Sequence, residues 1–226
     1  MTAGDTAVLP RRADARRNRE QVLAAAEAVF SERGVKAPIE EVARRAGVGV
    51  GTVCRHYPTK QALVDAVVRR LLEPLIERAR PALDATDPGQ AFRNFVFALS
   101  DVQARHVALA EQMAYEIDGA MEKGPLRAEL RTIANELLVR AQAAGSIRAD
   151  IGAADVSMLF SGAAHATSLV GEHQEELRHR YVTVILDGLR PMGASALPGH
   201  PMDYDEMQRV KSVGRARGGN TSGARR

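Results

Sequence analysis

Apolar residues recur every three or four positions through most of the chain, which is the spacing of amphipathic helices. In the N-terminal quarter this spacing predicts a helix over residues 15–33. It also predicts a short second helix that ends before Gly47 and has Pro38 in its first turn. A third short helix is predicted over residues 50–57, and Thr59 caps a long fourth helix. The N-terminal quarter is therefore expected to hold three helices followed by a long one.

The same spacing continues along the chain as far as residue 190. We expect a kink at Pro74 in the fourth helix and a break near Arg105 in the following one. Further helices are predicted over residues 91–120, from Pro125 to Gly145, over 153–170 and over 173–190. No alternation typical of β-strands is present. These patterns predict an all-α fold of about nine helices.

The charges are distributed unevenly along the 226 residues. Residues 1–60 hold eleven Lys and Arg against seven Asp and Glu, a net charge of +4. The same counts are fourteen against eighteen over residues 61–190, which gives −4, and six against three over residues 191–226, which gives +3. A basic N-terminal end on an acidic body indicates a polyanionic partner for that end, and a solvated basic arm is the alternative. We expect residues 1–14 and the Gly-, Ser- and Arg-rich tail over 191–226 to be disordered.

Several classes of protein are excluded by what the sequence lacks. It has no apolar run near 18 residues and no signal-peptide order at its start, so we expect a soluble cytoplasmic protein without a membrane partner. A single cysteine, Cys54, excludes an intramolecular disulfide and a cysteine-based zinc cluster. His173, Glu176 and His179 could be drawn as a metal site, but exposed histidines are the simpler interpretation. We expect no cofactor and no catalytic residues.

Three alternate glycines follow the second predicted helix and allow two interpretations. A dinucleotide-binding fingerprint needs G-x-G-x-x-G after a strand, whereas here Gly47, Gly49 and Gly51 alternate and follow a helix. A helix-turn-helix unit needs a glycine in the turn, an apolar residue between the helices and a second helix that can enter the major groove. Gly47 and Val48 fit the turn, and the residues up to Thr52 are small enough for the groove. This spacing favours a DNA-binding helix pair.

At this point the sequence resembles a known family. Residues 15–73 are similar to the N-terminal domain of TetR-family transcriptional regulators. The resemblance is carried by VLAAAEAVFSERG (22–34), IEEVARRAGV (39–48) and GTVCRHYPTKQALV (51–64). Beyond this quarter of the chain the similarity is limited to the helix pattern, including AQAAGSIRADI (141–151), which looks like the turn before the family's dimerising helices.

The resemblance implies a fold, a function and partners. It implies a three-helix helix-turn-helix domain over residues 15–60 and a helical ligand-binding and dimerisation domain over residues 61–190. The expected protein is a homodimer without enzymatic activity. It would regulate transcription, as a repressor in the family's common mode, by binding a palindromic double-stranded DNA operator from which a small-molecule effector releases it.

The resemblance also assigns DNA contacts by position. Three departures from the family's pattern (Gly49, Val50 and Cys54) remove hydrogen-bonding groups from the reading helix. We therefore expect phosphate contacts to supply much of the affinity, and base choice to come from apolar contacts and from arginines at the edges. The expected DNA-contacting residues are Arg17, Pro38, Arg44, Val50, Gly51, Thr52, Cys54, Arg55, His56 and Lys60.

For the second domain, core packing and function compete for the same residues. An effector cavity among the middle helices, which the resemblance implies, would be lined by Phe92, Phe95, Met113, Met158 and His165. A two-fold interface between the last two helices would include Ser161, Ala164, Tyr181, Ile185 and Leu189, with internal packing as the alternative.

Two alternatives of another functional class stay open on the sequence. One is a helical adaptor that binds a protein and has only non-specific affinity for DNA. The other is a nucleotide-dependent enzyme that uses the three glycines. A redox role of Cys54 on the DNA-facing helix is a further hypothesis, against the simpler interpretation of a small side chain.

Overall fold

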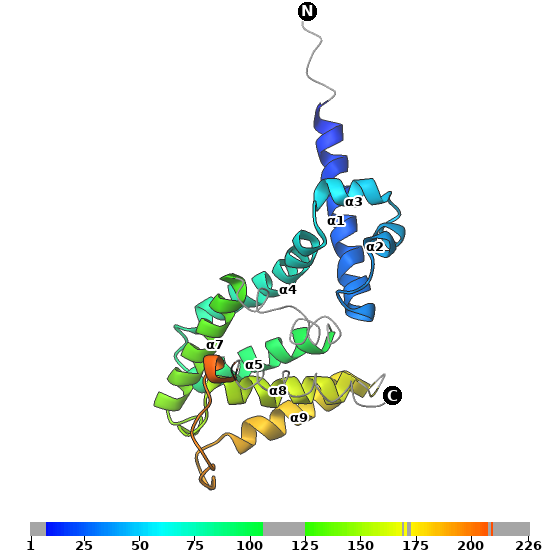
Figure 1. The fold of residues 1–226 in the computed structure, drawn as a ribbon. Helices are drawn as coiled ribbons and strands as arrows, with labels where there is room; N and C mark the ends of the chain where they lie inside the picture. Colours follow the sequence, from blue (N-terminus) through cyan, green and yellow to red (C-terminus); the bar gives the residue numbers. More distant parts are fainter. Residues whose placement is uncertain (1–7, 106–124, 169, 171–172, 208, 210–226) are drawn as a thin grey trace, which may run out of the picture. The chain divides into compact units, whose positions relative to one another are not determined.

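The computed structural model describes residues 8–105, 125–168, 170, 173–207 and 209. These residues form eight long or medium α-helices and no strand (Figure 1). The helices are α1 (Val8–Arg33), α2 (Ile39–Ala46), α3 (Val50–His56), α4 (Lys60–Ala82), α5 (Pro88–Arg105), α7 (Pro125–Ala143), α8 (Ala153–Ser168) and α9 (Gln174–Gly188). The predicted all-α fold is confirmed. None of the described helices is long and apolar enough to cross a membrane.

The chain divides into two compact units. The first contains α1, α2, α3 and α4 as far as Leu75, and the second begins at Ile76 and contains α5, α8, α9 and α7 from Glu129. In the first unit α1 packs on α2 and α3, and α2 packs on α3. The core of this unit is formed by apolar side chains that recur at helical spacing and are almost fully buried: Val22, Ala26, Val29, Phe30, Val42, Val53, Leu63 and Val67.

One helix limit in the first unit differs from the sequence prediction, and a proline in α4 does not end that helix. Helix α1 begins at Val8 rather than near residue 15, so the arm predicted over residues 1–14 is helical from Val8 onward. Pro10 lies in the first turn of this helix, where the missing N–H of proline costs no hydrogen bond. Helix α4 continues past Pro74 as one helix to Ala82, beyond the end of the first unit.

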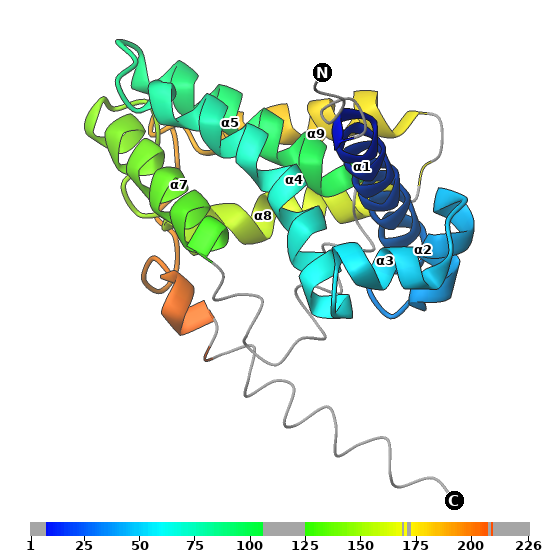
Figure 2. The same ribbon diagram turned by 90° about the horizontal axis from the view of Figure 1, so that it is seen from above.

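The second unit buries the inward faces of α5, α7, α8 and α9. Figures 1 and 2 both show α8 and α9 side by side, and these two helices are in contact. The core is made of aromatic and branched residues with at most 5% of their surface exposed: Phe92, Phe95, Val96, Ile133, Leu137, Leu138, Phe160, Val182 and Leu186. Most of the described helices in this unit lie within the ranges that their spacing predicts.

The C-terminal tail departs from the prediction of disorder. Residues 191–203 have no regular secondary structure, but they are followed by a short helical turn from Tyr204 to Met207. Asp203 begins this turn, because its carboxylate accepts the N–H of Glu206 at 2.7 Å. Met207 is 6% exposed and belongs to the core. The prediction of disorder rested on the Gly-, Ser- and Arg-rich composition of residues 191–226, and a segment of such composition can still pack; residues 208 and 210–226 of this tail lie outside the described residues.

Candidate DNA-binding site and ligand cavity

The turn between α2 and α3 is built on Gly47. Its backbone lies in the left-handed region, with φ 67° and ψ 28°, which glycine adopts at little cost and other residues rarely adopt. The N–H of Val48 donates to the carbonyl of Ala43 at 3.0 Å, and the N–H of Gly47 donates to that of Arg44 at 3.3 Å. These two bonds close the C-terminal end of α2. The turn glycine predicted from the sequence is confirmed.

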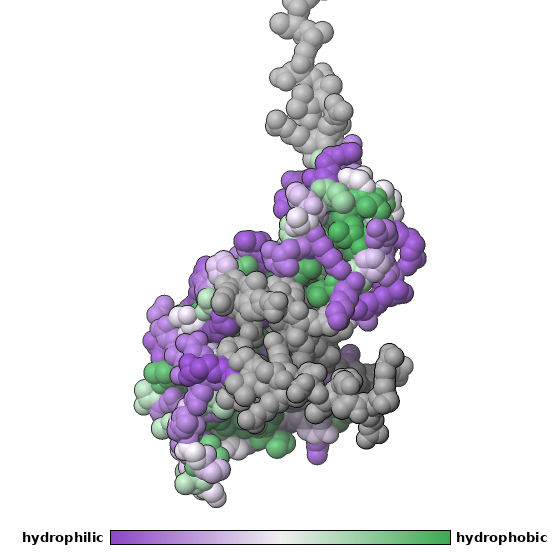
Figure 3. Space-filling model, viewed as in Figure 1, coloured by the Kyte–Doolittle hydropathy of each residue, from purple (hydrophilic) through white to green (hydrophobic). Residues whose placement is uncertain are grey.

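Helix α3 has one buried and one exposed face. Val53 is completely buried between α3 and the rest of the first unit, and Tyr57 follows at 4% exposure. On the opposite face Gly51, Cys54 and Arg55 are exposed. Val50 is also exposed, at 39%. This exposed face contains small or apolar residues and one cation, and Figure 3 shows hydrophobic residues beside hydrophilic ones on this part of the surface.

The N-termini of α3 and α4 are closed in different ways. Gly49 precedes α3 with an extended backbone and offers no side chain as a cap, at a cost of only a few tenths of a kcal/mol relative to serine. Thr59 caps α4, as predicted, because its hydroxyl accepts the N–H of Ala62 at 3.0 Å. Lys60 is the first residue of α4 and is half-buried. Pro38 precedes α2 with φ −69° and ψ 151°, so it is the N-cap residue and not part of the first turn as predicted.

Ion pairs occupy some of the arginines around α2. The guanidinium of Arg45 donates to both carboxylate oxygens of Glu32 at 2.5 and 2.6 Å, and this contact lowers the pKa of Glu32. Glu41 pairs with Arg33 at 2.7 Å and with Arg44 at 3.2 Å. The arginines in these pairs are well exposed, and pairs of this kind contribute about 0–1 kcal/mol. These arginines can therefore exchange their carboxylate partners for other anions.

Closer to α3, two cations lie outside these pairs. Within the described part of the chain, neither Arg55 nor Lys60 has a carboxylate within ion-pair distance. Arg17, by contrast, pairs with Asp14 in α1. Arg55 and Lys60 flank His56 and Thr59 at the junction of α3 and α4. The arrangement provides positive charge that is not neutralised locally, beside a narrow helix face without acidic groups.

The second unit contains a small cavity of about 20 Å³ between α5, α7, α8 and the C-terminal segment. This volume is of the order needed for one water molecule. Among the described residues, no Asp, Glu, Lys or Arg lines it. The lining is mainly apolar, with Gln103, Ser157 and Tyr204 as polar exceptions, and consists of Phe92, Phe95, Val96, Leu99, Gln103, Ala134, Leu138, Ala153, Val156, Ser157, Phe160 and Tyr204.

Comparison with known proteins identifies this architecture. Residues 22–67 match the family of bacterial regulatory proteins called tetR, and residues 87–191 match the C-terminal domain of SbtR-like transcriptional regulators. The crystal structure of a TetR regulatory protein from Mycobacterium vanbaalenii is 38% identical, with a TM-score of 0.54 over 80% of this chain and 99% of that one. The chain belongs to the TetR family of transcriptional regulators. It is a DNA-binding regulator and not an enzyme, which excludes the nucleotide-dependent alternative.

Two curated relatives of this TetR chain come from Mycolicibacterium smegmatis. The HTH-type transcriptional repressor KstR2 is 28% identical over 154 residues, which cover 63% of this chain and 72% of that protein. The HTH-type transcriptional activator FasR is 36% identical over 106 residues, which cover 46% of this chain and 48% of that protein. The similarity therefore extends to regulators of both signs.

The effector residues predicted for this TetR chain are only partly brought together. Phe92 and Phe95 line the cavity. Met158 and His165 do not line it: Met158 is 54% exposed and His165 is also exposed, because both lie on the outward face of α8. Met113 lies outside the described residues. The sequence analysis missed the polar lining residues, since an isolated Gln, Ser or Tyr has no sequence signature.

The interface residues predicted for a TetR dimer also separate into two groups. Tyr181 is 44% exposed, Ser161 is exposed and Ile185 is half-buried, so these side chains can reach a partner. Ala164 and Leu189 are 2% and 5% exposed and pack in the core of their own unit, so their burial does not support a role at the interface. Both were chosen for small or apolar character, which inward and outward positions of these helices share. Three further exposed apolar residues were not predicted at this interface: Met158, Leu159 and Val170.

Proposed function

We propose that this regulator binds a palindromic operator as a homodimer, with α3 of each copy in the major groove, and that a small-molecule effector releases it. The observation that carries the DNA part is the face of α3 and the start of α4. There, small and apolar side chains are exposed beside Arg55 and Lys60, which have no ion-pair partner among the described residues. A groove about 12 Å wide admits a helix whose leading side chains are this small.

We expect the exposed face of α3 to make two kinds of contact with DNA, to phosphates and to base edges. Arg55 and Lys60 are placed to bind phosphates, with His56 between them, and Thr52 can donate a hydrogen bond to either a base or a phosphate. Val50 can contact only an apolar group, and in the major groove that group is the methyl of thymine. Arg44 and Arg17 can join after exchanging their carboxylate partners for phosphates.

Exposed apolar residues on α8 and α9 support the homodimer. Met158 and Leu159 on α8 and Tyr181 and Val184 on α9 are between 43% and 63% exposed, and the two helices are adjacent. Such a concentration of exposed apolar side chains marks an interaction surface. In a two-fold arrangement this surface meets its own copy and forms a four-helix interface.

The cavity supports the response to an effector. It lies in the second unit, its lining is apolar with a few polar groups, and cavities of this kind between helices are common ligand sites. An effector that binds the released conformation more tightly than the DNA-bound one shifts the population away from the operator. We infer repression as the mode of action, which is the role in the name of KstR2, whereas FasR is named an activator.

The test is selection of bound duplexes from a random DNA library, followed by salt titration of the enriched sequence. A palindrome with half-sites about one helical turn apart supports a dimeric reader. Arg55→Ala should lower the slope of log K against log salt by about 1, because each phosphate contact contributes about 0.9 to the slope. Arg190→Ala in the second unit is the charge-matched control and should leave the slope unchanged. A library without an enriched sequence contradicts the proposal.

A further inference from the structure

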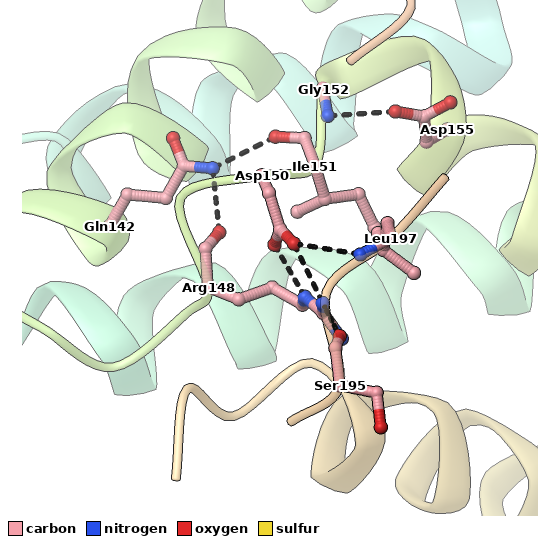
Figure 4. Close-up of polar contacts among 8 residues, drawn as sticks. All are labelled: Gln142, Arg148, Asp150, Ile151, Gly152, Asp155, Ser195 and Leu197. Atoms are coloured by element: carbon pink, nitrogen blue, oxygen red, sulfur yellow. Dashed lines mark hydrogen bonds and ion pairs between the residues drawn. The ribbon is translucent and has the colours of Figure 1, made fainter. Parts of the chain in front are cut away.

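The C-terminal strap, residues 191–207, is attached to the second unit at two carboxylates. The first is Asp150, whose Oδ2 accepts the N–H of Leu197 at 3.3 Å (Figure 4). Arg148 holds this carboxylate in place by donating to both of its oxygens, at 2.5 and 2.7 Å, and also donates to the carbonyl of Ser195. The contact with Arg148 lowers the pKa of Asp150 to about 2, so the carboxylate is ionised at neutral pH.

The second attachment is at the start of α8. Oδ2 of Asp155 accepts the N–H of Gly152 at 2.9 Å and the N–H of Met202 in the strap at 3.2 Å. The strap passes so close to Gly152 that a Cβ there would lie 2.5 Å from the carbonyl oxygen of Met202. Only glycine permits this approach without movement of the strap. The two attachments fix the course of the strap just before Tyr204.

Tyr204 is the residue of the strap that lines the cavity. Its side chain forms part of the cavity lining, as does that of Ser157 on α8, and the interaction with Ser157 offsets part of the rise in pKa that burial causes. The guanidinium of Arg131 lies 5.8 Å from the centre of its ring. Burial raises the pKa of the Tyr204 hydroxyl, so the phenol is neutral at physiological pH. Met207, one turn later, is buried in the core.

The size of the cavity shows that something must move before an effector can enter. Ligand sites in proteins have volumes of roughly 300–1,000 Å³, whereas this cavity measures about 20 Å³. Its other lining residues lie on α5, α7 and α8, or directly at their ends. Tyr204 alone among them comes from the strap. Removal of one tyrosine side chain is therefore the change that enlarges the cavity without moving a long helix.

We propose that Tyr204 is an intramolecular plug of the effector cavity, and that the effector takes its place. This inference rests on the effector response proposed above. The chemistry of the plug indicates that of the effector: an uncharged, mainly apolar molecule with a hydroxyl or similar group that reaches Ser157. A second polar contact is available at Gln103, whose Oε1 is buried and accepts no hydrogen bond from the described residues, while its Nε2 donates to Ser161 at 3.3 Å.

The probe for a test is Nile red, an uncharged apolar dye that fluoresces when it leaves water, titrated into the full-length chain. Tyr204→Ala should bind the dye at least about tenfold more tightly than the wild type, because the fraction of open cavity divides the apparent dissociation constant. Gly152→Ala keeps the tyrosine but displaces the strap, and should tighten binding in the same direction by a smaller factor. Met192→Ala changes a residue of the strap that is 94% exposed and should match the wild type.

The site of dye binding is checked with p-cresol, which has the structure of a tyrosine side chain. It should displace the dye from Tyr204→Ala and fail to do so from the wild type. The plug proposal is overturned if folded Tyr204→Ala binds the dye no more tightly than the wild type does, or if p-cresol does not reduce that binding. If circular dichroism shows that Tyr204→Ala does not fold, Gly152→Ala decides instead: dye binding no tighter than in the wild type overturns the proposal. Operator binding is measured in parallel without dye. If the wild type binds no operator sequence, the proposed function is refuted, whatever the result with the dye.

Discussion

The hydroxyl of Tyr57 is buried without a hydrogen-bond partner among the described residues. The residue is 4% exposed and packs in the core of the first unit, directly after the reading helix. The ring has another polar neighbour, because the guanidinium of Arg19 lies 5.8 Å from its centre. Tyr57→Phe removes the oxygen and keeps the ring, so it isolates the free energy of the unpaired hydroxyl.

The expected effect is an increase in stability. In the unfolded chain the hydroxyl is hydrogen-bonded to water, and leaving it unpaired in a folded interior costs about 1–3 kcal/mol. Phenylalanine preserves the apolar burial and the contact with Arg19, so we expect Tyr57→Phe to raise the free energy of unfolding by about 1 kcal/mol or more. The matched variant is Tyr204→Phe, which deletes the same hydroxyl from a tyrosine that is not among the buried groups without a hydrogen-bond partner. That change relieves no such penalty, so it should leave stability unchanged or lower it by up to about 1 kcal/mol.

Urea unfolding followed by circular dichroism measures both effects, and native-state hydrogen exchange assigns each to its own unit. In thermal unfolding, 1 kcal/mol corresponds to a shift of about 2–4 °C for a chain of this size. The two variants carry the same chemical change, but only Tyr57→Phe should raise the free energy of unfolding. A loss of stability in Tyr57→Phe would show that its hydroxyl has a partner and refute the reasoning.

Three further predictions concern the turn, the reading helix and the proposed interface. Gly47→Ala should lower the free energy of unfolding by about 1 kcal/mol in urea unfolding, because φ is 67° at this position. An unchanged free energy would contradict the conclusion that the turn requires glycine. Val184→Asp places a charge on a residue that is 63% exposed, and should convert a dimer to monomer in sedimentation without loss of helix. Cys54→Ser should leave operator affinity and any response to peroxide unchanged, and loss of that response alone would indicate a redox role.

The first unit could be predicted well because its signals are local. The turn at Gly47 and the cap at Thr59 each follow from the residue itself and its immediate neighbours. Accordingly, α3 begins at the predicted residue Val50. The main miss, the early start of α1, concerns residues 8–14 (VLPRRAD), whose large apolar residues, Val8 and Leu9, are adjacent and do not recur at helical spacing, so the pattern offered no evidence of a helix there.

The second unit was harder because its faces are chosen by tertiary contacts. On α8 both faces carry small or apolar residues, so Ala164 and Met158 could not be assigned to the inside and the outside. The strap was missed for a related reason. Its attachments are backbone N–H groups that donate to Asp150 and Asp155, and any residue except proline supplies such a donor. Composition cannot show where those donors find an acceptor.

Helix α3 exposes few side chains that can hydrogen-bond to bases, and the cations near its C-terminal end have no ion-pair partner among the described residues. Gly51 and Cys54 offer little hydrogen bonding to bases and Val50 offers none, so direct readout is limited to apolar contact and to the edges of the helix. The ion pairs around α2 meanwhile hold several arginines, and leave Arg55 and Lys60 uncompensated by the described residues at the end of α3 that we propose contacts DNA. Affinity should thus depend steeply on salt. Specificity should depend more on thymine methyl groups and on the shape and deformability of the operator than on a dense set of base hydrogen bonds.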